Sequence, residues 1–201
     1  MSLFPMFLKL EGRVCLVVGA GRVGESKIRS LVAAGAKVRT VAPVATPTVA
    51  NWDRLGVVTW DRRAFDSADL GGAFLVVAAT SSCLVNDLIF REAGQRGILC
   101  NVVDDPERCD FYYPAVVRRG DLQIAISTAG RSPALAQRLR RSLALQFPAR
   151  CAGWVSALGR EREILLGQSL DPEYRRQLLH EMASGPVGPG DGVSREIRHG
   201  R

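Results

Sequence analysis

The chain has 201 residues, of which 47% are hydrophobic and 23% are charged, and its formal net charge is +7. A chain of this length and composition can bury a full core and is typical of a soluble globular protein. No apolar run reaches the roughly 18 residues of a membrane-spanning helix, and the first residues lack the basic start and cleavage site of a signal peptide. We therefore expect a cytoplasmic protein without a membrane partner.

Residues 13–103 alternate short apolar runs with stretches of helical spacing. Apolar runs rich in β-branched residues predict strands that are buried on both faces of a parallel sheet. The predicted strands cover residues 13–19, 37–41, 57–60, 74–79 and 98–103, and the predicted helices cover residues 24–34, 47–55 and 86–96. Pro43 is expected to end the second strand. This alternation predicts an α/β fold with a Rossmann-type parallel sheet.

The pattern changes after residue 112. The predicted elements there are strands 113–118 and 122–127 around the hairpin turn Arg119-Gly120-Asp121, a helix between the N-cap Ser132 and Pro148, and helices 152–166 and 172–182. The predicted organisation is a Rossmann domain over 1–112, a small α+β region over 113–148, a helical C-terminal region over 149–184 and a disordered tail over 185–201.

Residues that commonly bind metals are sparse. The five cysteines contain no CxxC pair, and Cys15 and Cys100 lie within apolar strand runs, so we expect reduced, buried thiols. The only histidines, His180 and His199, lie in the C-terminal part of the chain. We therefore predict no metal site.

The excess positive charge is concentrated in one segment. Residues 113–150 hold seven arginines and a single acidic residue, Asp121, whereas basic and acidic residues nearly balance on either side. Such a patch attracts an anionic partner, which can be a nucleic acid or a small polycarboxylate or polyphosphate. Arginine suits bidentate recognition of either anion.

A glycine-rich motif, GxGxxG, directly follows the first predicted strand and opens a helix. Its glycines are Gly19, Gly21 and Gly24. Glycine lets backbone N–H groups approach a pyrophosphate at the helix N-terminus, so this context predicts a bound dinucleotide. The structural alternative is a tight strand–helix turn without a ligand.

The position that usually selects the dinucleotide departs from the Rossmann pattern. The second strand ends in Val41-Ala42-Pro43-Val44, without the acidic residue that commonly binds the ribose of NAD. Backbone groups must then hold that ribose. Arg22 and Arg39 leave NADP open as an alternative to NAD.

Polar residues follow the fourth and fifth predicted strands. Thr80 follows the fourth strand, and Asn101 and Asp104 lie at the end of the fifth. Ligands of open α/β sheets lie at these carboxyl ends, so Asp104 can act as a general base beside the cofactor. Its alternative role is a turn cap or a solvated carboxylate. The segment from Thr128 to Ser132 precedes a predicted helix and is either a second anion site or an ordinary helix cap.

Several segments together resemble the siroheme-synthase N-terminal family, which comprises precorrin-2 dehydrogenases and bifunctional dehydrogenase/ferrochelatases. The matching segments are FLKLEGRVCLVVGAGRVGESK, GAKVRTVAP, LVVAATSSCLVN, CNVVDDPERCDFYYPAVVRRGDLQIAIST and AGRSPALAQRLR. They cover residues 5 to 145 in the family's order. The phrase NVVD followed by a hairpin and G-x-SP is far more specific than the glycine loop.

The resemblance implies NAD-dependent oxidation of precorrin-2 to sirohydrochlorin by an intertwined homodimer, with residues 113–148 serving dimerisation and substrate binding. Some family members also insert ferrous iron to give siroheme. The family's catalytic aspartate falls on Asp104, and its serine in the central turn falls on Thr128, which keeps a hydroxyl group.

The resemblance and the motifs together define the predicted sites. The predicted cofactor-binding residues are Gly19, Gly21, Arg22, Val23, Gly24, Pro43, Val44, Thr80 and Asn101. The predicted substrate-binding residues are Arg118, Arg119, Thr128, Arg131 and Arg138, because a tetrapyrrole polycarboxylate complements a cluster of arginines.

Two other functions remain open from the sequence. A non-catalytic Rossmann module that senses NAD(H) would share the glycine loop, although such modules usually carry the missing acid after the second strand. A nucleic-acid-binding protein would use the basic segment 113–150 and would bind DNA with a steep salt dependence. We favour the enzyme, with no nucleic-acid partner.

Overall fold

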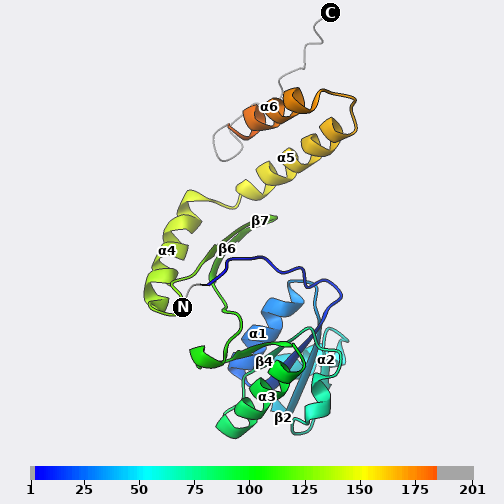
Figure 1. Ribbon diagram of the computed structural model, residues 1–201, viewed down its shortest axis with the longest axis vertical. Helices are drawn as coiled ribbons and strands as arrows, with labels where there is room; N and C mark the ends of the chain where they lie inside the picture. The colour runs from blue at the N-terminus through cyan, green and yellow to red at the C-terminus, as the bar shows by residue number, and fades with distance from the viewer. Residues whose placement is uncertain (1–2, 185–201) are drawn as a thin grey trace, which may run out of the picture. The chain divides into compact units, whose positions relative to one another are not determined.

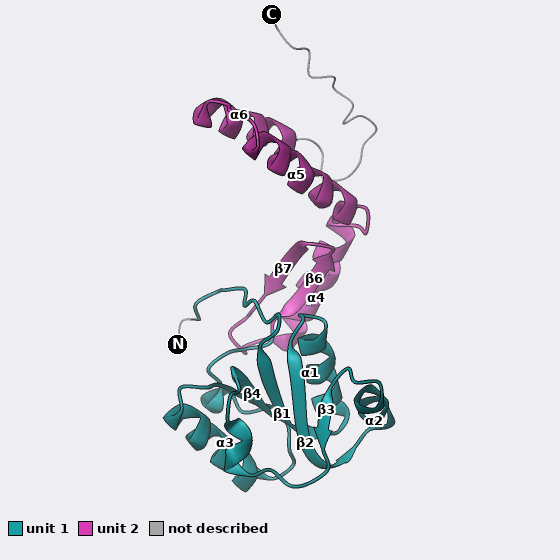
Figure 2. Cartoon of the chain, turned by 90° about the vertical axis from the view of Figure 1, so that its right-hand side faces the viewer, with its two compact units in different colours: residues 1–113 teal, residues 114–201 magenta. Residues whose placement is uncertain are grey.

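The computed structural model describes residues 3–184 of the chain. The chain divides into two compact units, Met1–Tyr113 and Pro114–Arg201, which Figure 2 colours separately. The segment 185–201, for which we expected a disordered tail, lies outside the described residues.

The first unit is built on a five-stranded parallel sheet with the strand order β3-β2-β1-β4-β5. Figure 1 labels β2 and β4 of this sheet. Its strands are β1 (Val14–Ala20), β2 (Lys37–Ala45), β3 (Thr59–Asp61), β4 (Leu75–Ala78) and β5 (Leu99–Val102). Its α-helices are α1 (Arg22–Val32), α2 (Pro47–Arg54) and α3 (Cys83–Gln95), with short 3-10 helices η1 (Ser67–Leu70) and η2 (Pro106–Arg108). The Rossmann-type fold predicted from the sequence is confirmed.

The sheet has a hydrophobic core on each face. Successive residues of β1 point to opposite faces, so Cys15 and Val17 enter one cluster while Leu16 and Val18 enter the other. Ile28 of α1 joins the first cluster and Ile89 of α3 joins the second. Cys15 and Cys100 are buried free thiols as predicted, and burial raises the pKa of Cys15 to about 11.

Several predicted boundaries in this unit were wrong, among them those of β2, α1 and α3. Strand β2 continues through Pro43 to Ala45, because the pairing register with β1 shifts between Val18 and Ala20 and the bulge tolerates a residue without an N–H. Helix α1 begins at Arg22 rather than at residue 24, and α3 begins at Cys83 because Ser82 caps it through the N–H of Val85.

The second unit consists of a hairpin and three helices. The hairpin pairs β6 (Ala115–Arg119) with β7 (Leu122–Ile126), and the helices are α4 (Pro133–Gln146), α5 (Cys151–Leu166) and α6 (Pro172–Ala183). Gly120 occupies the turn with φ of 57°, a left-handed conformation that favours glycine. Ser132 caps α4 through the N–H of Leu135, as predicted. Across residues 3–184, every helix is too short or too polar to cross a membrane.

Candidate cofactor and active site

The glycine loop between β1 and α1 is shaped by close backbone approaches. Gly19 has a φ of 100°, and a Cβ there would clash with the carbonyl group of Ala79. A Cβ at Gly24 would clash with the carbonyl oxygen of Gly19. The first and third glycines of the motif are therefore required by the turn itself, whereas Gly21 faces open space. The open side at Gly21 is where a ligand can reach the backbone.

The N-terminus of α1 is free to bind an anion. Its N-cap, Gly21, has no side-chain capping hydrogen bond. By contrast, Thr46 caps α2 and Ser82 caps α3 through their side-chain oxygens. The first N–H groups of a helix need a partner, and the helix dipole favours a negative one. The uncapped start of α1 therefore fits the pyrophosphate of a dinucleotide.

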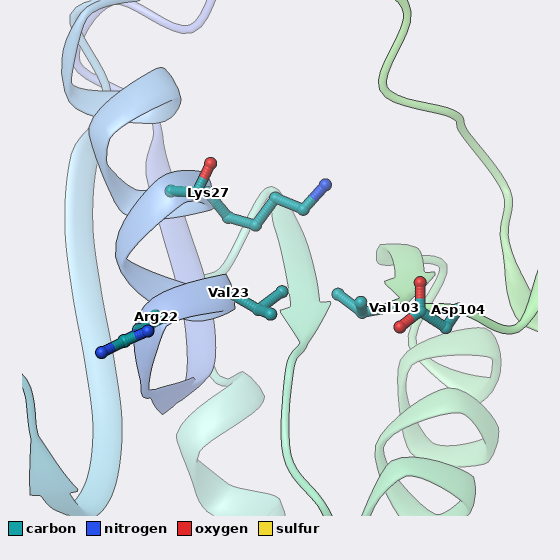
Figure 3. A pocket seen from close by; sticks show the side chains of 6 residues that line it. Arg22, Val23, Lys27, Val103 and Asp104 are labelled. Carbon is teal, nitrogen blue, oxygen red and sulfur yellow. The ribbon is translucent and has the colours of Figure 1, made fainter. Parts of the chain in front are cut away.

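The ends of three adjacent strands converge beside this loop. One cavity of about 300 Å³ is lined by Gly21, Arg22, Val23, Ala79, Thr80, Ser81, Val103 and Asp104. A second of about 360 Å³ is lined by Arg22, Val23, Ser26, Lys27, Val103 and Asp104 (Figure 3). These residues follow β1, β4 and β5, which are neighbours in the sheet. The glycine loop and Asp104 thus share the same hollow at the carboxyl edge of the sheet.

Asp104 has an unusual backbone conformation. Its φ is 61°, and it is one of two non-glycine residues with positive φ among residues 3–184. Aspartate tolerates this region better than most residues, and such conformations concentrate at functional sites. The adjacent Asp105 is engaged differently, because its carboxylate accepts a hydrogen bond from Arg108 at 2.9 Å. Only Asp104 of the pair lines the two cavities.

Thr80 and Asn101, both predicted to contact the cofactor, have different surroundings. Thr80 lines the cavity, and its hydroxyl donates to Oδ1 of Asn86 at 2.7 Å. Asn101 is buried and lines neither cavity. Its amide donates to the carbonyl oxygen of Phe111 at 2.8 Å and to Sγ of Cys109 at 3.2 Å. Asn101 thus fastens the segment after Asp104 to β5.

The loop after β2 offers an exposed surface without an acidic group. Pro43 and Val44 are exposed, Val44 to 78%. Arg39, which had left NADP open, donates to Oδ1 of Asp69 at 3.1 Å and also lies 3.7 Å from Asp61. Its guanidinium group is therefore engaged within the fold. Of the two arginines that left NADP open, Arg22 and Arg39, only Arg22 lines the cavities.

Lys27 is a site residue that the sequence reasoning missed. It is half-buried and lines the cavity with Asp104. Its Nζ lies 3.8 Å from the centroid of the Tyr113 ring. Burial lowers the pKa of Lys27, while the nearby Asp104 and Cys109 partly oppose that shift. The spacing of four residues from Val23, which places both on one face of α1, was the signal available in the sequence.

The predicted substrate residues lie in the second unit and differ in their engagement. Arg131 and Arg138 are exposed, and Arg118 is exposed with a 3.3 Å hydrogen bond to Gln123. Arg119 instead donates to the carbonyl oxygens of Phe147 at 2.6 Å and Ala144 at 3.0 Å, at the end of α4. The hydroxyl of Thr128 accepts from the N–H of Ser132 at 3.1 Å, as in an ordinary turn before a helix.

Comparison with protein families gives two consecutive matches. A family of NAD(P)-binding proteins matches residues 6–115, and the family of sirohaem biosynthesis protein central regions matches residues 119–145. The first match alone covers more than half of the chain.

Individual relatives agree with the family matches. Siroheme synthase 1 of Aeromonas salmonicida is 36% identical over 184 residues, which cover 92% of this chain and 39% of that protein. Siroheme synthase of Methylobacillus flagellatus is 37% identical over 188 residues, covering 94% of this chain and 40% of that protein. The chain thus spans about two fifths of the length of these curated relatives.

A solved structure supports the same relationship over nearly the whole chain. SirC, a precorrin-2 dehydrogenase, superposes with a TM-score of 0.77 at 27% sequence identity. The match covers 90% of this chain and 89% of SirC.

Proposed function

Because the chain belongs to the siroheme-synthase N-terminal family, we propose that it oxidises precorrin-2 to sirohydrochlorin with NAD as the hydride acceptor. One observation carries this proposal: Asp104 lines the same cavity as the glycine loop. A carboxylate at that place can receive a proton from a substrate held next to a nicotinamide ring.

The residues present fit a dinucleotide. The uncapped N-terminus of α1 would bind the pyrophosphate, and the exposed backbone at Pro43 and Val44 would face the adenosine ribose. NAD, when bound, supplies the acceptor for the hydride. We propose NAD rather than NADP because Arg39 is engaged with Asp61 and Asp69, which leaves it unsuited to a 2′-phosphate.

Asp104 is the residue to which we assign the chemistry. It would accept a proton from the substrate as the hydride leaves, acting as a general base. The positive φ fixes the direction in which its side chain leaves the backbone, while Asn101 and Cys109 fasten the segment that follows it. The backbone that carries the base is therefore held by the fold before the substrate arrives.

We further propose that exposed arginines of the second unit bind the carboxylates of the tetrapyrrole. Arg118, Arg131 and Arg138 are accessible, whereas Arg119 is engaged at the end of α4. A homodimer also forms part of this proposal, because Leu135, Leu139 and Leu145 of α4 are exposed apolar side chains. Nucleic acid and membranes have no place in it.

Insertion of ferrous iron is a second candidate activity, supported by relatives that are named siroheme synthases. Asp104 would accept the two pyrrole protons one after the other and pass each to solvent as iron enters. Iron would be a substrate of this reaction. Among residues 3–184, no group of three or more His, Cys, Asp or Glu side chains is placed to hold a metal ion. We place both reactions in the cytoplasm, since the five cysteines are free thiols.

The test is formation of NADH by the purified chain supplied with precorrin-2 and NAD. We expect the wild type to produce NADH and Asp104→Ala to reduce the rate at least about hundredfold, because general-base catalysis contributes that much. Asp105→Ala is the matched control and should stay within about threefold of the wild type. Equal rates for the wild type and Asp104→Ala would remove Asp104 from the mechanism.

A titration with sirohydrochlorin, followed by absorbance, separates the rival functions. The enzyme should bind this product, and ferrous iron added to the same sample should convert it to siroheme if the second activity exists. Binding of NAD without any binding of sirohydrochlorin would favour a sensing module. Salt-sensitive binding of DNA in place of the tetrapyrrole would favour a nucleic-acid-binding protein.

A further inference from the structure

A half-buried cation faces the proposed catalytic base across the cavity. Lys27 lies on α1 four residues after Val23, and both side chains line the hollow that contains Asp104. Figure 3 shows the side chain of Lys27 extending from α1 with its amine toward the side where Val103 and Asp104 lie. The ammonium group therefore belongs to the wall of the cavity.

This ammonium group is held by a ring rather than by an opposite charge. Its Nζ lies 3.8 Å from the ring centroid of Tyr113, which in turn lies 5.8 Å from the ring of Phe111. Within residues 3–184, Lys27 forms no ion pair with a carboxylate inside 4.0 Å. A cation–π contact replaces only part of the hydration that a lysine loses on burial. Lys27 is thus a fixed, incompletely compensated positive charge.

The cavity contains one other cation, Arg22, and its position differs. Arg22 is the first residue of α1 and belongs to the glycine loop, where the pyrophosphate of the cofactor would bind. Lys27 lies more than one helical turn farther along α1, beside Tyr113. The two cations therefore serve different parts of the hollow.

We propose that Lys27 binds a carboxylate of the tetrapyrrole and so positions the ring beside Asp104. This inference rests on the proposed function and adds to it a specific contact in the first unit. Burial lowers the pKa of Lys27, and a carboxylate bound beside its amine would oppose that shift because an opposite charge stabilises the ammonium form. The chemistry also fits a phosphate of the cofactor, and kinetics can distinguish the two anions.

The test compares Lys27→Met with Lys27→Arg and with Lys37→Met, an exposed lysine at the start of β2. We expect Lys27→Met to raise the KM for precorrin-2 about tenfold, as for one lost charge-assisted hydrogen bond, while the KM for NAD changes less than about twofold. The Kd of sirohydrochlorin should rise by a similar factor. Lys27→Arg should recover part of the loss, and Lys37→Met should match the wild type.

Several results would overturn the proposal. A rise in the KM for NAD alone would assign the ammonium group to the cofactor. Unchanged constants for both ligands would make Lys27 a purely structural partner of Tyr113. If Lys27→Met does not fold, as judged by its thermal unfolding, Lys27→Gln is measured in its place and the same criteria apply.

The control for the proposed function is the wild type itself. If the wild type makes no NADH from precorrin-2 and does not bind sirohydrochlorin, the proposed function fails and the inference on Lys27 fails with it. If the wild type turns over and Lys27→Met equals it in both KM values, only the inference on Lys27 fails.

Discussion

The two units of the chain differ in how they bury apolar side chains. The first unit has a hydrophobic cluster on each face of its sheet, with Leu16, Ile28 and Val77 among its fully buried residues. Within residues 114–184, the buried apolar residues are only Ala115, Val117, Ala136, Cys151 and Leu165. The first unit therefore has a core of its own around the candidate site, whereas the second leaves apolar side chains of α4 exposed, among them Leu145.

The two units also differ in where their charged side chains lie. The first unit keeps a few charged groups in the wall of a cavity, where Asp104 and Lys27 face each other. The second unit exposes Arg131 and Arg138 to solvent. Of these cavity residues Lys27 is half-buried and Asp104 is exposed, and the backbone of Asp104 has a positive φ. Exposed arginines suit capture of an anionic ligand. In the function that we propose, the first unit carries the catalytic base and the second unit attracts the anionic substrate.

The largest effect that tests this comparison is the loss of a core side chain in the first unit. Ile28 of α1 is 0% exposed and packs in the cluster that also contains Cys15 and Val17. Ile28→Ala should lower the free energy of unfolding by about 3–4 kcal/mol, because it removes buried carbon atoms and leaves a cavity. Urea unfolding followed by circular dichroism measures the change.

The matched variant in the second unit is Leu145→Ala. Leu145 lies in α4 and is 84% exposed, so at low protein concentration its loss should change the free energy of unfolding by less than about 0.5 kcal/mol. If a second copy covers α4, the effect should grow with protein concentration. Equal losses for the two variants at low concentration would contradict the contrast between the units.

The next effect concerns the glycine loop. Gly19→Ala forces a residue with a Cβ into a φ of 100° and against the carbonyl group of Ala79. We expect a loss of about 2–3 kcal/mol in the free energy of unfolding and no measurable binding of NAD. Calorimetric titration with NAD and thermal unfolding measure the two quantities.

Gly21→Ala distinguishes the role of the glycine loop in binding NAD from its role in forming the turn. A Cβ at Gly21 meets nothing within 4 Å, so the fold should lose less than about 1 kcal/mol. The added methyl group nevertheless stands where backbone and pyrophosphate approach each other, and the affinity for NAD should fall about tenfold or more. Unchanged affinity in Gly21→Ala would support the alternative of a tight turn without a ligand.

The sequence predicted the elements of both units better than the partners of individual side chains. Apolar runs reveal buried strands because burial on both faces demands them. The continuation of β2 past Pro43 depends on a bulge in its pairing with β1, which no local pattern contains. Asn101 was predicted to contact the cofactor at the end of the fifth strand, but it is buried within β5 and its amide donates to the carbonyl oxygen of Phe111, ten residues away. The hydrogen-bond partner of such a side chain depends on which later segment packs against it, and a local sequence pattern does not contain that information.

An ion-pair cluster in the first unit should give a smaller effect that depends on pH. The side chain of Asp69 is 5% exposed, and its carboxylate accepts two hydrogen bonds from Arg63, at 2.6 and 2.8 Å. These bonds lower the pKa of Asp69 in the folded protein. The resulting stability is complete above the unfolded value of about 4 and is lost as the pH falls through the lower folded value.

Asp69→Asn should lower the free energy of unfolding by about 2 kcal/mol at neutral pH and flatten its decline below about pH 4. The control in the second unit is Glu173→Gln, because Glu173 pairs with Arg176 at the surface and both side chains are largely exposed. That variant should change the free energy of unfolding by less than about 0.5 kcal/mol. Parallel pH profiles for Asp69→Asn and the wild type would rule out this source of acid sensitivity.

The smallest expected effect distinguishes an arginine of the second unit that stabilises α4 from one that binds the substrate. Arg119 donates to the carbonyl oxygens of Phe147 and Ala144, which are among the unpaired acceptors at the end of α4. Arg119→Met should therefore lower the free energy of unfolding by about 1 kcal/mol. Among residues 3–184, Arg138 has no ion pair, so Arg138→Met should leave that free energy unchanged and raise the KM for precorrin-2 instead. A raised KM in Arg119→Met without loss of stability would return Arg119 to the substrate, as the sequence alone had predicted. In that case the hydrogen bonds of Arg119 to the end of α4 would contribute nothing measurable to stability, and its role would be to bind the substrate.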